Sequence, residues 1–98
     1  MKCIFCKQET ENRNNSEPLS KKPCCNYCNM RFVVPVRMAE SKGRKPKVRL
    51  TYMEGEPQME AGLTGELTMV DDIGQIHVNW ENGSTLALNA EVDIFSIY

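Results

Sequence analysis

The second half of this 98-residue chain lacks lysine and arginine, because every basic side chain lies at or before position 49. The chain also has a single histidine, no Gly-rich phosphate loop, and no serine or cysteine in a recognisable nucleophile motif. No apolar run is long enough for a signal peptide or a membrane span. These absences argue against an enzyme, a secreted protein and a membrane protein, so we expect a cytoplasmic one.

Cysteine, by contrast, is plentiful. Four of the five cysteines form two Cys-x-x-Cys pairs, Cys3 with Cys6 and Cys25 with Cys28, with 18 residues between the pairs. Two intervening residues allow a tight backbone turn, a knuckle, to aim both sulfurs at one ion, and a spacer of about 15 to 20 residues allows a second knuckle to complete a tetrahedron. We therefore predict a zinc ribbon in which Cys3, Cys6, Cys25 and Cys28 bind one structural zinc ion.

Two points about the cysteines stay open at this stage. Disulfide or redox chemistry is an alternative, although the odd cysteine count and the absence of a βαβ pattern disfavour it. The third ligand could also be Cys24, since its spacing of three to Cys28 is tolerated at zinc sites. Asn29 stands after the second pair, where a knuckle often needs a positive φ angle, and Lys7 fits the matching position less well.

Composition divides the chain into three parts. We expect a zinc ribbon over residues 1–38, a basic linker over 39–46 and a small acidic β-barrel over 47–98. The β-branched and aromatic stretch Met30–Met38 predicts a strand or hairpin arm of the ribbon, with an edge or bend at Pro35.

Alternating apolar residues and turn signals in the last 52 residues predict five short strands. They are expected over residues 47–52, 63–70, 75–80, 84–88 and 93–98. Asn82-Gly83 is typical of a tight hairpin, because this dipeptide accepts positive φ angles. The overall prediction is a mostly β protein whose second unit is a five-stranded barrel of the Src-homology or Tudor kind.

The formal net charge of −1 hides a strong asymmetry. Residues 1–50 carry 12 basic and 4 acidic side chains, a charge of +8, whereas residues 51–98 carry 9 acidic side chains and a charge of −9. The basic run indicates either phosphate contacts or a solvated linker, and it comprises Lys42, Arg44, Lys45, Lys47 and Arg49. The acidic half indicates either a docking surface for a basic protein or a solvated face, with candidate contacts Glu54, Glu56, Glu60, Glu66, Asp71, Asp72 and Glu81.

Candidate catalytic residues are few. His77 falls on the polar side of its predicted strand and is interpreted as a surface residue. Asp71-Asp72 precedes Ile-Gly and is interpreted as a turn. Four cysteines around one ion leave no open coordination position for water, so the predicted zinc is structural and no catalytic residue is assigned.

Two segments resemble known phage proteins. Lys22–Asn29, followed by Val33–Arg37, is similar to the N-terminal zinc knuckles of small phage and prophage proteins. Gly65–Leu88 resembles an uncharacterised domain common in phages of Gram-positive bacteria. In size and zinc content the chain also resembles anti-CRISPR proteins, which inhibit the RNA-guided nuclease of type II systems.

The resemblance implies an inhibitor in the host cytoplasm that binds the type II CRISPR nuclease through its acidic residues and hinders target DNA loading. Such docking is physically reasonable because that nuclease has strongly basic channels for guide and target. Two other hypotheses remain: a nucleic-acid-binding zinc-ribbon regulator that uses the basic run, and a structural or assembly adaptor between two phage or host proteins.

Overall fold

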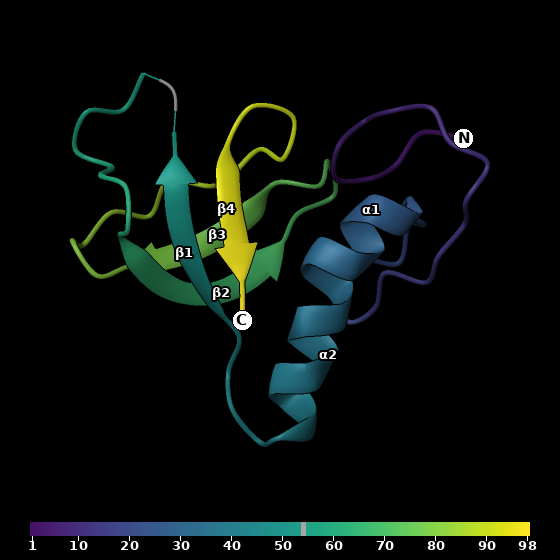
Figure 1. The fold of residues 1–98 in the computed structure, drawn as a ribbon, viewed down its shortest axis with the longest axis horizontal. Helices are drawn as coiled ribbons and strands as arrows, with labels where there is room; N and C mark the ends of the chain where they lie inside the picture. The colour runs from purple at the N-terminus through teal and green to yellow at the C-terminus, as the bar shows by residue number, and fades with distance from the viewer. Residues whose placement is uncertain (54) are drawn as a thin grey trace.

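A helical segment lies beside an antiparallel sheet in the structure, a computed structural model that describes residues 1–53 and 55–98 (Figure 1). The N-terminal 25 residues form loops that approach the first turns of the helical segment. In chain order the elements are α1 (Asn26–Cys28), a π-helix, η1 (Asn29–Val33), α2 (Val34–Ser41), β1 (Lys47–Tyr52), β2 (Thr64–Val70), β3 (Ile76–Trp80) and β4 (Ile94–Ile97).

The helical segment owes its position to one apolar face. Phe32, Val33, Val36 and Ala39 are buried, and their three- and four-residue spacing places them on one side of a helix. Pro35 lies at the start of α2, directly after the π-helix, and it has no N–H group to donate to the preceding turn. After Lys42 the chain leaves the helix at Gly43, which has a φ of +72° that glycine adopts without strain.

The prediction of a strand or hairpin arm over Met30–Met38 was therefore wrong. Local β propensity is a weak signal, and here the burial of one helical face overrides it. The predicted linker over 39–46 also needs correction, since α2 continues to Ser41.

The sheet has four antiparallel strands in the order β3-β2-β1-β4. Four of the five predicted strands are confirmed, with ends within about two residues of those expected. The predicted strand over 84–88 is absent, and this stretch meets β3 through an isolated bridge between Ile76 and Leu88. Within this stretch, the carbonyl of Leu86 accepts a hydrogen bond from the indole N–H of Trp80 at 2.9 Å. In a regular ladder that carbonyl would accept from a backbone amide of β3.

The sheet is consequently open, and the prediction of a five-stranded barrel was wrong. The edge strand β4 lies next to the π-helix, where the Arg31 guanidinium donates to the carbonyl of Phe95 at 3.1 Å. A helix and a side chain thus protect the edge that barrel closure was expected to remove.

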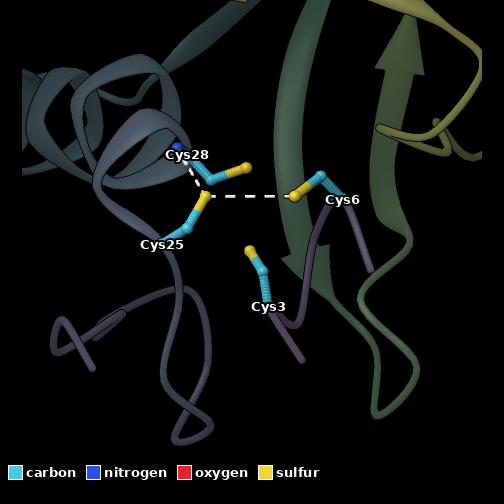
Figure 2. A group of neighbouring side chains, drawn as sticks. All are labelled: Cys3, Cys6, Cys25 and Cys28. Atoms are coloured by element: carbon cyan, nitrogen blue, oxygen red, sulfur yellow. Dashed lines mark hydrogen bonds between the residues drawn. The ribbon is translucent and has the colours of Figure 1, made fainter. Parts of the chain in front are cut away.

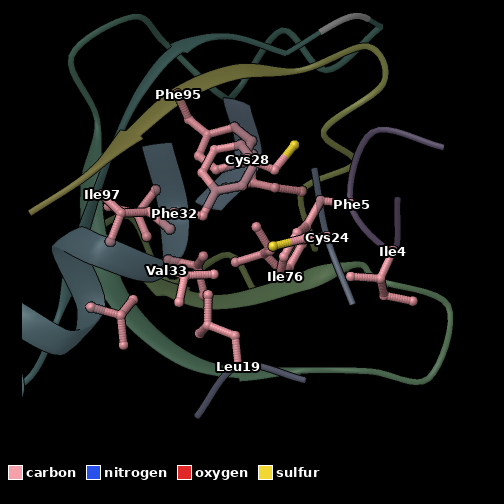
Figure 3. Packing of buried hydrophobic residues seen from close by; sticks show 14 of the residues in the cluster. Ile4, Phe5, Leu19, Cys24, Cys28, Phe32, Val33, Ile76, Phe95 and Ile97 are labelled. Carbon is pink, nitrogen blue, oxygen red and sulfur yellow. The ribbon is translucent and has the colours of Figure 1, made fainter. Parts of the chain in front are cut away.

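One hydrophobic cluster joins the N-terminal loops, the helical segment and the inner face of the sheet (Figure 3). At its centre the ring of Phe32 stacks on that of Phe95 with centroids 5.0 Å apart and meets the ring of Phe5 edge-on at 5.5 Å. These aromatic contacts connect three segments distant in sequence, and they fix the cysteine-bearing loops relative to the sheet.

Candidate metal centre

Four cysteine side chains converge where the N-terminal loop meets the first turn of the helical segment (Figure 2). The sulfurs of Cys3, Cys6, Cys25 and Cys28 all lie within 4.8 Å of one another. The Sγ atoms of Cys6 and Cys25, one from each pair, are 3.9 Å apart. The structure thus brings together the four residues that the Cys-x-x-Cys spacing predicts as ligands.

The first pair is held by a tight turn of the backbone. The amide of Cys3 donates to the carbonyl of Gln8, and the amide of Lys7 donates to the carbonyl of Cys3, at 3.0 and 3.1 Å. Lys7 has a φ of +63°, the left-handed conformation that turns the chain back on itself. Its ammonium group donates to the carbonyls of Ile4 and Ile73, which holds the strained turn against the sheet.

The second pair lies at the start of the helical segment. Cys25 is the N-cap of α1, and its sulfur accepts from the amide of Cys28 at 3.4 Å. Because a helix follows, Asn29 has a φ of −58°, so the prediction of a left-handed residue there was wrong. Lys7, judged less suitable from sequence, adopts the positive φ instead.

The cluster is well shielded from solvent. Cys3, Cys25 and Cys28 are buried, whereas Cys6 is half-buried. A hydrogen bond with Cys28 lowers the pKa of the Cys3 thiol, and the same contact raises the pKa of the Cys28 thiol. Burial raises the pKa of the Cys6 thiol. One thiolate therefore makes ionisation of its neighbours more costly, and a divalent cation would reverse this by stabilising all four.

The geometry fits a tetrahedral metal ion better than a disulfide. Metal–sulfur bonds of about 2.3 Å in a tetrahedron place the sulfurs about 3.8 Å apart. The 3.9 Å between Cys6 and Cys25 matches this separation and is far from the ~2.0 Å of a disulfide. All five cysteines are free thiols. The donor set of four sulfurs suits a thiophilic ion.

Cys24 takes no part in the cluster, which contains its neighbour Cys25. Its backbone forms a two-way bridge with Asn14, at 3.1 and 3.0 Å, and its side chain is fully buried. Burial raises the pKa of the Cys24 thiol and keeps it protonated. The expectation of an unliganded, buried Cys24 agrees with this arrangement.

The turn after β2 connects the cysteine cluster to the sheet. Gly74 in this turn approaches the carbonyl of Ile4 so closely that a Cβ atom would overlap it. The Lys22 ammonium donates to the carbonyl of Asp72 at 2.9 Å. The first cysteine pair is therefore braced by the sheet as well as by its own loop.

The Asp71 side chain organises the same turn. One carboxylate oxygen accepts from the amides of Ile73 and Gln75, and the other lies 2.9 Å from Nε2 of His77. The interpretation of Asp71-Asp72 as a turn agrees with these bonds. The His77 side chain is 38% exposed and contacts the turn-forming carboxylate.

The remaining candidate acids do not form one surface. The paired strands bring residues 53 and 55–62, turn 81–83 and loop 89–93 to one end of the sheet, and the amide of Asn82 donates to the carbonyl of Gln58 across it. We call this region the acidic end; it carries Glu56, Glu60, Glu81, Glu91 and Asp93. Glu66 pairs instead with Lys45 at 3.3 Å, and Asp71 and Asp72 lie at the opposite end. Glu54 is outside the described residues.

The predicted basic run forms an exposed stretch that leads from α2 into β1. Its five members, Lys42, Arg44, Lys45, Lys47 and Arg49, are all exposed. Tyr98, which the sequence analysis did not connect with this run, lies beside it, with the guanidinium of Arg49 5.5 Å from the centre of its ring. Tyr98 lies beside Arg49 because β4 pairs with β1, and this pairing cannot be recognised from the sequence alone.

The fold and the cysteine cluster define a small β-rich protein with a candidate four-thiolate metal site. The chain belongs to a family described as a domain of unknown function (DUF4314), which matches residues 36–98. The match begins within α2 and leaves all four clustered cysteines outside it. Neither a curated protein nor a solved structure matches the chain. In the described part of the chain, no helix has the length and apolar character needed to cross a membrane.

Proposed function

We propose that this protein acts without catalysis, by binding a protein partner, and that one zinc ion held by Cys3, Cys6, Cys25 and Cys28 stabilises the binding fold. The observation that carries the zinc proposal is the convergence of four sulfurs within 4.8 Å. Zinc favours tetrahedral thiolate coordination, and four protein ligands leave no position for a reacting water. The metal then acts as a structural cross-link between the N-terminal loop and the helical segment.

The acidic end is the proposed docking surface. Glu60, Glu81 and Glu91 are exposed there, and residues 51–98 contain no lysine or arginine. One cation of the helical segment, Arg31, lines a pocket together with Glu91. The basic run begins at the other end of β1. A small protein whose charges are separated in this way is oriented by the electric field of a charged partner. This orientation favours association of the acidic end with a basic surface.

The type II RNA-guided nuclease is the candidate partner. Support comes from the resemblance in size and expected zinc content to anti-CRISPR proteins, and from the basic channels in which such nucleases hold guide and target. Occupation of a channel by the acidic end would hinder loading of target DNA by stoichiometric competition.

A gel-shift titration tests this function. Labelled duplex target DNA is mixed with guide-loaded type II nuclease, and the protein is added in increasing amounts. We expect loss of the nuclease–DNA band at about equimolar protein. Neutralising the acidic end in a Glu60→Gln, Glu81→Gln, Glu91→Gln variant should raise the required concentration about tenfold, since each removes one attractive charge.

The matched control removes three exposed acids elsewhere: Glu11→Gln, Glu40→Gln and Asp72→Asn. This variant has the same net charge as the first and should inhibit like the wild type. A nuclease–DNA band that persists at excess protein would exclude this partner and favour an adaptor between other proteins. A salt-dependent shift of the duplex by the protein alone would favour a regulator that binds DNA.

A further inference from the structure

The outer face of β1 and β4, opposite the hydrophobic core, combines positive charge with an exposed aromatic ring. In β1 the side chains of Val48 and Leu50 enter the core, so Lys47 and Arg49 face outward. In the register of the sheet Arg49 lies opposite Ser96, and Lys47 exchanges backbone hydrogen bonds with Tyr98 at 2.8 and 2.9 Å. Tyr98 is thereby held in the sheet beside both cations, with 39% of its surface exposed.

The charge on this face is largely uncompensated. Within the described residues, the ion pairs include only one member of the basic run, Lys45, which contacts Glu66 at 3.3 Å. Lys45 is itself highly exposed, so this pair is weak and readily replaced by another anion. The residues that pair with Arg49, Ser96 of β4 and Thr64 of β2, are uncharged, whereas Glu66 of β2 pairs with Lys47. A polyanion would meet no carboxylate among the residues paired with Arg49, and at Lys47 it would compete with Glu66, which also contacts Lys45.

A second arginine–tyrosine pair in the molecule provides a useful contrast. The guanidinium of Arg31 lies 5.2 Å from the ring centre of Tyr27, but it already donates to Tyr27 Oη and to the carbonyl of Phe95. The shallow pocket around that pair is also lined by Glu91 and Asp93. Tyr27 is more exposed than Tyr98, at 63% against 39%, but Tyr98 is the ring that lies beside the basic run.

We propose that this outer face of β1 and β4 binds single-stranded nucleic acid. Lys47 and Arg49, with the preceding cations of the basic run, would contact the phosphate backbone. Tyr98 would stack on a base, a contact that tolerates any sequence because every base has an aromatic face. Bases in a duplex are stacked on one another, so an exposed ring on a sheet favours unpaired strands. This site goes beyond the proposed protein docking, which uses the opposite, acidic end.

Fluorescence anisotropy with labelled twelve-nucleotide strands tests the proposal. Oligo-dU and oligo-U, which differ only in the 2′-hydroxyl, are used in parallel, and an unlabelled duplex of the same length serves as competitor. We expect salt-dependent binding of the single strands and weak competition by the duplex. A preference for oligo-U would identify contacts to the 2′-hydroxyl and hence RNA as the ligand, and equal affinity would identify the phosphate backbone and base stacking as sufficient.

Three variants assign the binding to named side chains. Tyr98→Ala should weaken binding about tenfold, whereas Tyr98→Phe should retain it, because stacking needs the ring and not the hydroxyl. Lys47→Gln should reduce the slope of log affinity against log salt by about 0.7, the value for one phosphate contact on a single strand. Tyr27→Ala is the matched control and should bind like the wild type.

The proposal is overturned if the single strands do not bind at low salt, if Tyr27→Ala weakens binding as much as Tyr98→Ala, or if the duplex competes as well as the single strand. A normal thermal transition in each variant shows that the change in affinity is not a loss of folding. Inhibition of the nuclease by the Tyr98→Ala variant can be measured separately. If single strands do not bind, the proposed protein docking still stands, and if the nuclease is not inhibited, the proposed single-strand site still stands.

Discussion

The N-terminal 25 residues and the sheet contribute to one hydrophobic cluster, but they are ordered by different means. Residues 1–25, all described, form turns and isolated bridges without a helix or strand, and they bury few apolar side chains besides Ile4, Phe5 and Leu19. The sheet buries at least one core residue from each of β1, β3 and β4, and hydrogen-bonded ladders join its four strands. Cross-links through a metal are common where a short segment cannot bury enough surface to offset its chain entropy.

From this comparison we expect the loss of one clustered cysteine sulfur to destabilise the fold more than the other substitutions considered below. Cys28→Ser should lose the proposed zinc ion and unfold residues 1–28, because structural zinc contributes about 10–16 kcal/mol in small zinc fingers. Metal analysis and amide hydrogen exchange measure the two effects. The matched control is Cys24→Ala, which removes an equally buried sulfur outside the cluster and should keep its zinc at a cost of about 1 kcal/mol. Equal zinc content in Cys28→Ser and wild type would refute the four-ligand site.

The aromatic stack tests how strongly the two regions depend on one another. Phe32→Ala removes the ring between Phe5 and Phe95 and should destabilise the protein by about 3–5 kcal/mol. Urea denaturation followed by Trp80 fluorescence measures this cost. Met30→Ala changes an exposed residue of the same helical segment and should cost less than about 0.5 kcal/mol. Similar midpoints for the two variants would mean that the sheet is stable without the helical segment.

A pair of glycines isolates the contact between the first cysteine pair and the sheet. Gly74 and Gly83 have the same φ of +86°, so alanine meets the same backbone strain at both, about 1–2 kcal/mol. A Cβ at position 74 overlaps the carbonyl of Ile4, whereas nothing lies within 4 Å of one at position 83. We expect Gly74→Ala to lower the thermal midpoint by several degrees more than Gly83→Ala. Equal shifts would show that the Ile4 contact is unimportant.

In both the N-terminal region and the sheet, the features that could be predicted from the sequence are those that depend on local spacing. The cysteine cluster follows from spacing, because a short loop with two cysteines at either end has few ways to arrange its sulfurs. Strands with strict alternation, such as Ile76, Val78 and Trp80, were also predicted, since period two is a local property.

What could not be predicted depends on partners distant in the chain. Phe32 and Val33 have strand-like composition, and only packing on Phe5 and Phe95 shows that a helix buries them. The barrel prediction failed at a local contact instead, because the indole of Trp80 donates to the carbonyl of Leu86, which a regular fifth strand would use. The placement of Tyr98 beside Arg49 required the strand order, which local patterns do not specify.

The smallest expected effect concerns the turn that supports the first cysteine pair, and it depends on pH. Partial burial opposes ionisation of Asp71, but hydrogen bonds from His77 and from the amides of Gln75 and Ile73 prevail and lower its pKa. The carboxylate is thus favoured in the folded state. Its contribution is present above the unfolded pKa of about 3.9 and is lost as the pH falls through the lower folded value.

Asp71→Asn should therefore be less stable than the wild type near pH 6, by less than about 1 kcal/mol because the pair is partly exposed, and the difference should shrink as the pH falls below about 4. Thermal midpoints between pH 3 and pH 7 measure it. Asp72→Asn changes the exposed neighbour and should show a smaller difference at every pH. A difference for Asp71→Asn that stays constant down to pH 3 would mean that the turn depends on the shape of this side chain and not on its charge.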